Sequence, residues 1–360
     1  MMMYRMRFLL FLFMLGSSLS VSAQSGGYAV YEDIQGFFYV FDNGIVKQLE
    51  GLKVKEYKVA RNYVAYVNNQ SQFKLYDKGY NKTLAENLPE FFTTTDYLLV
   101  FGVGGNLYVY EDKRAQQVAS FVKQYVAGDS IVAFNNLNDN FTAYYKGRSR
   151  TLEVFAVTGL QAGKNILAYL DNMEQFQAYL YGQKYQLDNN PPKEYKCGRN
   201  TIAYVDFYGR FKIFYKGEII EADPFSPKSY QVGDNMVAYI NRNGQFMVFD
   251  DGIITEIESQ PPMEYELNDA IIAYSLPSRQ FKAYYKGETF VLESYIPESY
   301  KIDNELLVWP DYMNYLKALD HGEIVKATNR IQQGYELWLD VVVSDVGKGV
   351  PQIFHKGKFY

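Results

Sequence analysis

Two histidines and one cysteine are the first side chains to consider for chemistry. His321 and His355 are the only histidines among the 360 residues, and Cys197 is the only cysteine. A Ser-His-Asp triad or a histidine-rich zinc site needs histidine beside suitable partners. Both histidines fall at turn positions of a repeat, described below, where other copies carry lysine or tyrosine. We therefore interpret them as repeat variation, and we expect no catalytic residue, no metal site and no cofactor.

The single cysteine cannot form a disulfide within the chain. Cys197 occupies an apolar repeat position that Val59, Val232 and Ile302 fill in other copies. A free cysteine in such surroundings behaves as a small buried apolar side chain. We expect Cys197 to be a structural thiol and not a nucleophile.

Paired carboxylates could act as general acid and base on a glycosidic bond. Five glutamates flank a repeated tyrosine position and could line a channel if their strands are innermost. Lysine, serine and glutamine recur at the same positions in other copies, which is typical of solvent-exposed edges. Asp234, Asp303 and the pair Asp250-Asp251 lie in turns, where aspartate is common. The five glutamates are Glu56, Glu194, Glu264, Glu266 and Glu336.

Two further motifs have simpler explanations. Residues 136–140 alternate oxygen-bearing side chains like a calcium loop, but they lack its central glycine and distal glutamate. Residues 102–105 are glycine-rich, but no strand-to-helix context of a phosphate loop surrounds them. We interpret both segments as hairpin turns.

A repeat of about 35 residues organises the chain, and it has about ten copies. One column of the repeat contains only alanine or valine: Val30, Ala65, Val100, Ala133, Ala168, Ala203, Ala238, Ala273, Val308 and Val343. A second column is mostly tyrosine: Tyr57, Phe92, Tyr125, Leu160, Tyr195, Tyr230, Tyr265, Tyr300 and Tyr335. A glycine usually closes a hairpin at a fixed distance from both columns. Period searches of this kind identify repeat folds.

The copy between residues 228 and 263 shows what one unit contains. Residues 228–232 and 253–257 alternate polar and apolar side chains, whereas residues 236–240 and 245–249 are mostly apolar. Alternation is typical of a strand with one wet face, and a continuous apolar run is typical of a strand covered on both faces. Turn residues separate the four segments. We therefore predict four antiparallel strands, A to D, with B and C at the centre.

A repeated four-stranded sheet covered on both faces is typical of the blade of a β-propeller. The alanine/valine column then lets the next sheet approach closely, and tyrosine and phenylalanine fill the layers between copies. An open β-solenoid or arc of stacked sheets is the alternative. It stays open because ten blades exceed the usual four to eight, and because the predicted mature chain begins just before strand B of the first copy. No segment has a helical apolar period.

The units resemble the blades of bacterial envelope β-propeller repeat proteins. The resemblance rests on the apolar-Ala-Tyr tripeptide, as in Val237-Ala238-Tyr239, and covers the chain after the leader. The Trp-Asp and Gly-His signatures of WD40 repeats are absent from the sequence. The resemblance implies an exported propeller and assigns no functional residue.

The N-terminus has the pattern of a secretory signal peptide. Arg5 and Arg7 precede an apolar run over residues 8–15, and Val21-Ser22-Ala23 fits a cleavage site. Eight apolar residues are too few to span a membrane, which takes about 20, and no later segment is long and apolar enough. We predict cleavage after Ala23, a single repeat domain over residues 24–360, and a periplasmic or extracellular bacterial protein.

The net charge of the chain limits the classes of molecule that it is expected to bind. Cleavage after Ala23 removes two of the 36 basic residues and none of the 41 acidic ones, so the net charge changes from −5 to −7. A mildly acidic chain disfavours nucleic acid as a partner. We expect a non-catalytic binding or scaffold protein that engages a protein or a glycan through one face or the central channel. The alternative is a glycan-active hydrolase or lyase that uses the inner-strand carboxylates.

The sequence leaves the binding residues and the oligomeric state open. Three copies depart most from the consensus, over residues 92–113, 303–319 and 334–360. In the last copy Pro351 replaces the aromatic residue of strand C, which suits an edge or terminal strand. These copies are either functional sites or caps of the array.

Overall fold

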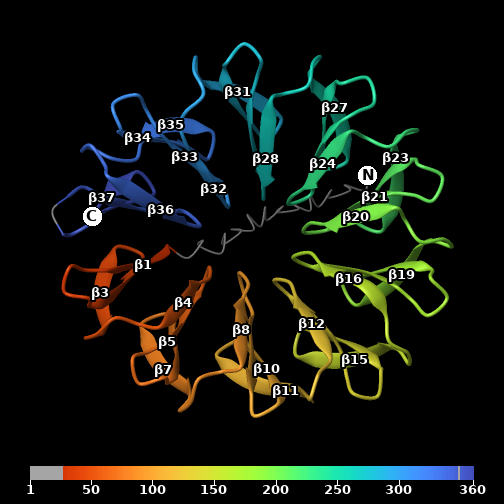
Figure 1. Cartoon of the computed structure of the whole chain (residues 1–360), viewed down its shortest axis with the longest axis horizontal. Helices are drawn as coiled ribbons and strands as arrows, with labels where there is room; N and C mark the ends of the chain where they lie inside the picture. The colour runs from red at the N-terminus through yellow and green to blue at the C-terminus, as the bar shows by residue number, and fades with distance from the viewer. Residues whose placement is uncertain (1–26, 348) are drawn as a thin grey trace, which may run out of the picture.

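The computed structural model describes residues 27–360 except residue 348. The predicted signal peptide, residues 1–23, lies outside this range. The described residues form 39 strands and no helix. No helix in this part of the chain could therefore cross a membrane. The strands make ten antiparallel sheets around a central axis, and Figure 1 looks down that axis.

Blades 2 to 10 each have four strands, called A to D from the axis outward, and the described residues of blade 1 form three, which correspond to B, C and D. The strands of blades 1 to 5 are β1 (Tyr28–Glu32), β2 (Phe38–Asp42), β3 (Ile45–Glu50); β4 (Glu56–Val59), β5 (Tyr63–Val67), β6 (Phe73–Asp77), β7 (Tyr80–Ala85); β8 (Phe91–Thr94), β9 (Leu99–Val103), β10 (Asn106–Glu111), β11 (Arg114–Ser120); β12 (Gln124–Ala127), β13 (Ile131–Asn135), β14 (Phe141–Tyr145), β15 (Arg148–Glu153); β16 (Thr158–Ala162), β17 (Ile166–Leu170), β18 (Phe176–Leu180) and β19 (Gln183–Asp188).

The strands of blades 6 to 10 are β20 (Glu194–Cys197), β21 (Thr201–Val205), β22 (Phe211–Tyr215), β23 (Glu218–Asp223); β24 (Ser229–Val232), β25 (Met236–Ile240), β26 (Phe246–Asp250), β27 (Ile253–Glu258); β28 (Glu264–Asn268), β29 (Ile271–Ser275), β30 (Phe281–Tyr285), β31 (Glu288–Glu293); β32 (Lys301–Asp303), β33 (Leu306–Pro310), β34 (Leu316–Asp320), β35 (Glu323–Lys326); β36 (Gly334–Trp338), β37 (Val341–Asp345), β38 (Gln352–His355) and β39 (Lys358–Phe359).

The predicted four-stranded blade is confirmed. The copy between residues 228 and 263 forms β24 to β27, with each boundary within one residue of the prediction. Strand B is almost wholly buried, whereas the first half of strand D is exposed, because B is covered on both faces and D is the outer edge. The alanines of the small-residue column are fully buried. A small side chain is needed there because the neighbouring sheet packs directly on it.

The ring is closed, so the open arc is excluded. Strand β1 contacts β37 (Figure 1), and Ala29 and Phe41 pack with Val341 and Ile353 in one apolar cluster. The His355 ring meets the edge of Phe41 with ring centres 5.7 Å apart. Within the described residues, side-chain packing between the first and last blades closes the ring, and no strand is exchanged between the ends.

Aromatic side chains fill the layers between blades. Phe246 of β26 packs against Tyr265 and Tyr274 of the next blade, with ring centres 4.9 and 5.4 Å apart. The Tyr274 hydroxyl donates to Glu258 of the preceding blade (2.9 Å), and Lys282 donates to the same carboxylate (2.8 Å). The same column in other blades repeats this packing. The tyrosine content is therefore explained largely by cohesion between blades.

Glycines in the turns between strands A and B set how closely blades meet near the axis. A β-carbon on Gly163 would lie 1.9 Å from the carbonyl oxygen of Gly198 in the next blade, and one on Gly198 would lie 2.1 Å from that of Gly233. Backbone then touches backbone from blade to blade. No larger residue fits at these positions without separating the blades.

The meander gives the ring two unlike faces. Successive turns of an antiparallel sheet lie at opposite ends of the strands. The B–C turns and the D–A connections therefore form one face, called here the B–C face. The A–B turns and C–D turns form the opposite face, called here the A–B face.

Candidate functional site

One residue of each A–B turn forms a ring around the axis at the A–B face. This residue directly follows the position that Gly163, Gly198 and Gly233 occupy at the end of strand A. Strand A is the innermost strand of each blade, so the residue lies near the axis. The ring contains three cations, four aspartates, one asparagine and one leucine: Arg61, Asp96, Asp129, Lys164, Arg199, Asp234, Asp269, Asn304 and Leu339. Around the ring, pairs of aspartates follow the cations in turn. Each cation can therefore form ion pairs with an aspartate of a neighbouring blade or of a blade farther around the ring.

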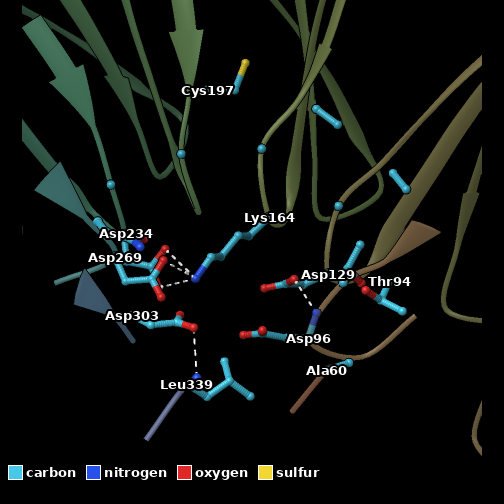
Figure 2. A pocket seen from close by; sticks show the side chains of 18 of the residues that line it. Ala60, Thr94, Asp96, Asp129, Lys164, Cys197, Asp234, Asp269, Asp303 and Leu339 are labelled. Carbon is cyan, nitrogen blue, oxygen red and sulfur yellow. Dashed lines mark hydrogen bonds and ion pairs between the residues drawn. The ribbon is translucent and has the colours of Figure 1, made fainter. Parts of the chain in front are cut away.

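Ion pairs cross the axis between blades that are not neighbours (Figure 2). Lys164 of blade 5 binds Asp269 of blade 8 and lies 3.3 Å from Asp234 of blade 7. Arg199 of blade 6 binds Asp234 at 2.7 Å and reaches Asp129 at 3.4 Å. The channel is therefore constricted at this end by side chains that meet across it.

Arg61 continues the network on the other side of the axis. Its guanidinium lies 3.0 Å from Asp96 of blade 3 and donates to Asn304 of blade 9 at 2.9 Å. The backbone N–H of Asp96 donates to Asp129 at 3.0 Å. These contacts tie blade 2 to blade 9, so the network links blades 2 to 9 around the axis.

The network perturbs the ionisation of its members. Burial, together with the nearby charge of Asp96, raises the pKa of Asp129 to about 6 against the opposing effect of Lys164 and Arg199. Burial likewise raises the pKa of Asp303 to about 6, although a hydrogen bond from the Leu339 N–H opposes the shift. Burial lowers the pKa of Lys164, but the carboxylates of Asp269 and Asp234 outweigh it and raise the pKa. Two carboxyl groups on the axis thus titrate in weakly acidic solution.

The A–B turns enclose an axial cavity of about 470 Å³, whose lining includes the four ring aspartates and Asp303 (Figure 2). Asp234 lies in an A–B turn, as we expected, whereas Asp303 is the last residue of β32 and not a turn residue. Both carboxylates line the cavity. The strand A glutamates are solvent-exposed, as their repeat column indicated, and the alternative that they line a channel does not hold for this cavity. Glu56, Glu194, Glu264, Glu266 and Glu336 are exposed and do not line it.

The histidines and the cysteine lie apart from any common site. His321 is exposed in a C–D turn beside Asp320 and Glu305. His355 is buried at the ring closure, 3.2 Å from Asp340. Cys197 borders the axial cavity with its side chain packed in the layer between blades, and burial raises its pKa to about 12. Within the described residues no group of three or more histidine, cysteine or acidic side chains could hold a metal ion.

The remaining sequence motifs are structural turns. Residues 136–140 join β13 to β14, where Asn136 accepts hydrogen bonds from the N–H groups of Asn138 and Asn140. Residues 102–105 end β9 and form its turn to β10. Asp250 and Asp251 lie at the end of β26 and in the C–D turn that follows it.

Seven of the B–C turns share one geometry that orients two residues outward. In blade 6 the Asp206 carboxylate accepts from the N–H groups of Tyr208 and Arg210, and the fourth turn residue, Gly209, has a φ of +88°. This is the pattern of a type I turn followed by a left-handed residue. The same acceptor position is occupied by Asp33, Asn68, Asn136, Asp171, Asn241 and Asp311 in other blades.

Exposed apolar side chains gather on the B–C face. Among the described residues, the turns and connections of that face carry sixteen exposed large apolar side chains, whereas the turns of the A–B face carry two, Tyr97 and Tyr181. The sixteen are Ile34, Leu52, Leu88, Phe121, Leu137, Val154, Phe155, Met173, Phe207, Tyr208, Phe225, Met263, Tyr312, Met313, Ile331 and Val350. Large apolar side chains gathered on one surface are typical of an interaction site.

The densest aromatic display on this face comes from blade 6. Phe207 and Tyr208 are adjacent, with ring centres 5.5 Å apart, and the Arg210 guanidinium lies 5.5 Å from the Tyr208 ring. The connection to blade 7 adds Phe225, whose ring lies 4.7 Å from the Arg242 guanidinium. Tyrosine and arginine are the side chains that most often dominate binding energy at interfaces.

The copies that depart from the consensus have different places in the ring. Residues 92–113 lie in blade 3, whose glycine-rich B–C turn displays no large side chain. Residues 303–319 lie in blade 9 and display Tyr312 and Met313 on the B–C face. Residues 334–360 form blade 10, where β38 begins directly after Pro351 and the blade packs against blade 1. The last copy is thus the closing blade of the ring.

The chain matches one family model and is similar to several solved structures. The chain is similar to the computationally designed Ika8 protein (16% identity, 73% of this chain and 95% of that chain, TM-score 0.33). It is also similar to the CRINKLY WD40 ectodomain of the Arabidopsis thaliana receptor kinase ACR4 (10%, 64% and 92%, TM-score 0.36) and to the tricorn protease (10%, 92% and 45%, TM-score 0.31). No curated protein matches the sequence. A family model described as a 10-bladed beta propeller domain matches residues 22–360, and the chain therefore belongs to the ten-bladed β-propeller domain family.

Proposed function

We propose that this protein is an exported, non-catalytic scaffold that binds a protein or glycan partner through its B–C face. The observation that carries the proposal is the contrast between the faces, with sixteen exposed large apolar side chains on the turns of one and two on those of the other. Surfaces of this kind lose unfavourable contact with water when a partner covers them.

The turn geometry adds specificity to this surface. A hydrogen-bonded Asx turn holds each displayed pair of residues in one conformation, so little conformational entropy is lost on binding. The displayed pairs differ from blade to blade, as in Asn172-Met173, Phe207-Tyr208 and Tyr312-Met313. A rigid framework with variable, aromatic-rich tips is also the arrangement that antibodies use for recognition.

The axial aspartates favour a structural role over catalysis. Lys164, Arg199 and Arg61 bind four of them across the axis, so their charges already have partners. A glycosidase needs two carboxylates free to reach the substrate oxygen and carbon. We therefore keep the hydrolase only as the outcome that would contradict the proposal.

Photo-crosslinking in the producing cell tests the proposed face. A crosslinking amino acid replaces Met173, Tyr208 or Tyr312 on the B–C face, and Lys78, Lys216 or Lys286 in C–D turns serves as the matched control. We expect adducts with one partner from the first three positions and none from the controls. Adducts only from the controls, or turnover of a glycan panel that Asp129→Asn or Asp303→Asn abolishes, would contradict the proposal.

A further inference from the structure

Positive charge gathers on one part of the B–C face, at the neighbouring blades 6, 7 and 8 (Figure 1). The B–C turns of these blades and the connections that enter them are called here the basic sector, and they are residues 189–193, 206–210, 224–228, 241–245, 259–263 and 276–280. The sector contains one acidic side chain, Asp206, and five basic ones: Lys193, Arg210, Lys228, Arg242 and Arg279. Five positive charges and one negative charge give a balance of +4, whereas the whole chain has a net charge of −5.

Most cations of the basic sector have no carboxylate to pair with. Arg210 binds Asp206 at 2.8 Å. The other four are exposed and form no ion pair with any described residue: Lys193, Lys228, Arg242 and Arg279. Residues 1–26 and residue 348 contain no acidic side chain, so every acidic residue of the chain belongs to the described part. The carboxylates of this chain therefore leave these four cations unpaired.

Two other blades show what the lysine that precedes strand A binds. This repeat position holds Lys55 in blade 2 and Lys123 in blade 4. The Lys123 ammonium binds the Asp139 carboxylate at 2.6 Å, and the Lys55 ammonium donates to the Ser71 hydroxyl at 2.6 Å. Both acceptors are the fourth residue of the B–C turn in their own blade. The lysine thus reaches over the turn and binds an oxygen there.

In blades 6 and 7 the fourth residue of the turn is glycine. The Lys193 Nζ lies 3.3 Å from where a β-carbon would stand on Gly209, and the Lys228 Nζ lies 3.5 Å from that position on Gly244. The two ammonium groups therefore lie over their turns as Lys123 does in blade 4, but glycine offers them no side-chain oxygen. A carboxylate from another molecule can take the place that Asp139 fills in blade 4.

The aromatic side chains of the sector suit a polypeptide better than a glycan. The rings of Phe207 and Tyr208 are perpendicular, with an interplanar angle of 90°, so they do not form one flat surface on which sugar rings could stack. The Arg242 guanidinium lies over the Phe225 ring at 4.7 Å and covers one of its faces. Aromatic rings arranged in this way contact other apolar side chains through their edges as well as their faces.

We propose that the basic sector binds an acidic polypeptide segment of the partner, in which aromatic or aliphatic residues separate the carboxylates. Two of these carboxylates pair with Lys193 and Lys228, and the apolar side chains contact Phe207, Tyr208 and Phe225. This inference rests on the proposed function, because it names the partner's chemistry and the blades that contact it. Charge complementarity of this kind speeds association and disfavours partners of like charge.

A pair of synthetic peptides tests the partner's chemistry. The probe is a fluorescent peptide that repeats the sequence Glu-Glu-Phe, and its control repeats Gln-Gln-Phe. Both are titrated into the exported protein and followed by fluorescence anisotropy, and polygalacturonate is titrated separately as an acidic glycan. We expect saturable binding of the acidic peptide that weakens as the salt concentration rises. We expect weaker binding of the glutamine peptide and of polygalacturonate.

Replacing the two lysines tests the site. The double variant Lys193→Gln, Lys228→Gln should bind the acidic peptide roughly tenfold more weakly, as the loss of two exposed ion pairs does. Lys123→Gln is the matched control, because this lysine has the same repeat position but is already neutralised by Asp139. We expect its dissociation constant to equal that of the unaltered protein.

A second pair of variants supplies the missing acceptor from the chain itself. In Gly209→Asp, Gly244→Asp each turn gains the carboxylate that Asp139 provides in blade 4, so peptide binding should again weaken roughly tenfold. The two glycines have φ values of +88° and +92°. Asparagine and aspartate tolerate such backbone conformations similarly, so Gly209→Asn, Gly244→Asn carries the same strain without the charge. It should weaken binding less than the aspartate variant does.

Several results would overturn this inference. They are equal binding of the acidic and glutamine peptides, tighter binding of polygalacturonate than of the acidic peptide, and unchanged peptide binding by the variant that lacks Lys193 and Lys228. A dimer of the exported protein that dissociates in that variant would assign the sector to a second copy.

The crosslinking described above separates this inference from the proposed function. Adducts from Met173, Tyr208 and Tyr312 together with any of these overturning results would leave the B–C face as the binding surface and remove the acidic polypeptide as its ligand. Specific binding of the acidic peptide without adducts from those positions would support the chemistry of the sector and contradict the proposed function.

Discussion

Lys164 of blade 5 forms an ion pair with Asp269 of blade 8, although 105 residues separate them in the chain. Only a closed ring with converging inner strands brings these two side chains together. The contact therefore belongs to the assembled ring and to no single blade, and the stability of the ring should respond to it.

Replacing Lys164 by methionine should lower the free energy of unfolding by about 2 kcal/mol, somewhat below the 3–5 kcal/mol of a fully buried pair. Methionine has an apolar side chain of similar length to the methylene chain of lysine, so packing is kept. The loss of stability therefore reflects the carboxylates of Asp234 and Asp269, which are left without a cation. Chemical denaturation at neutral pH measures the change. Lys216→Met breaks a largely exposed pair with Asp251 and should change the free energy of unfolding much less than Lys164→Met does. Equal changes in the free energy of unfolding for the two variants would show that the axial ion pairs stabilise the ring no more than a surface ion pair does.

Asp303→Asn should stabilise the protein more at pH 7.5 than at pH 5. The pKa of Asp303 is raised to about 6, so the folded state binds this proton more tightly than the unfolded state does. The stability that protonation supplies is present below the unfolded pKa of 3.8 and is lost as the pH rises through about 6. The asparagine oxygen can still accept from Leu339. We expect a gain of about 2 kcal/mol at pH 7.5, and a gain that is independent of pH would contradict this account.

Gly198→Ala should open the contact between blades 6 and 7. The added β-carbon would lie 2.1 Å from the Gly233 carbonyl oxygen, which is backbone and cannot rotate away. We expect a loss of about 3 kcal/mol, at the upper end for overpacked sites, seen as a lower thermal unfolding temperature. Gly334→Ala is the control, because nothing lies within 4 Å of its β-carbon position. Similar unfolding temperatures for the two variants would contradict the close approach.

Two tyrosines of one repeat column should respond differently to loss of the hydroxyl. Tyr274 donates to Glu258, so Tyr274→Phe should cost about 1 kcal/mol. The buried Tyr204 hydroxyl has no hydrogen-bond partner among the described residues, so Tyr204→Phe should be neutral or slightly stabilising. Denaturant midpoints of the two variants test the difference. The reverse order would show that a water or an undescribed group satisfies Tyr204.

Cys197 should be inert in the folded protein. Burial raises its pKa to about 12, so the thiolate that reacts with alkylating agents is scarce at pH 8. We expect reaction with a disulfide reagent only at the rate of unfolding, and full reaction in denaturant. Rapid modification of the native protein would mean that the axial cavity admits reagents and that the thiol is available for chemistry.

Much of the fold could be predicted because the repeat columns each report one physical constraint. The buried alanines such as Ala238 marked the strand B that meets the next sheet, and the tyrosines such as Tyr265 marked the layers between blades. Ring closure could not be predicted, since it depends on the small rotation between neighbouring blades. That rotation is set by packing such as Phe41 on His355, between residues more than 300 positions apart.

The axial network was missed although a signal for it existed. Asp96, Lys164 and Arg199 share one repeat column, but their charges differ, so the column resembled a variable turn. Its position after the close-contact glycines was the clue that these turns converge. The B–C face had a clearer signal, because Asp206 and Asp311 recur at the first position of turns that then display large apolar pairs, Phe207-Tyr208 and Tyr312-Met313.

The central claim is that the B–C face binds the partner, and the affinity of the crosslinked partner for paired variants tests it most directly. The double variant Phe207→Ser, Tyr208→Ser removes two exposed aromatic side chains from that face, and Lys216→Ser, Asp251→Ser removes an exposed ion pair from the other. Calorimetric titration of the purified partner should show at least tenfold weaker binding to the first variant, as loss of an aromatic hot spot does, and an unchanged dissociation constant for the second. Unchanged affinity for the first variant with weakened affinity for the second would contradict the account.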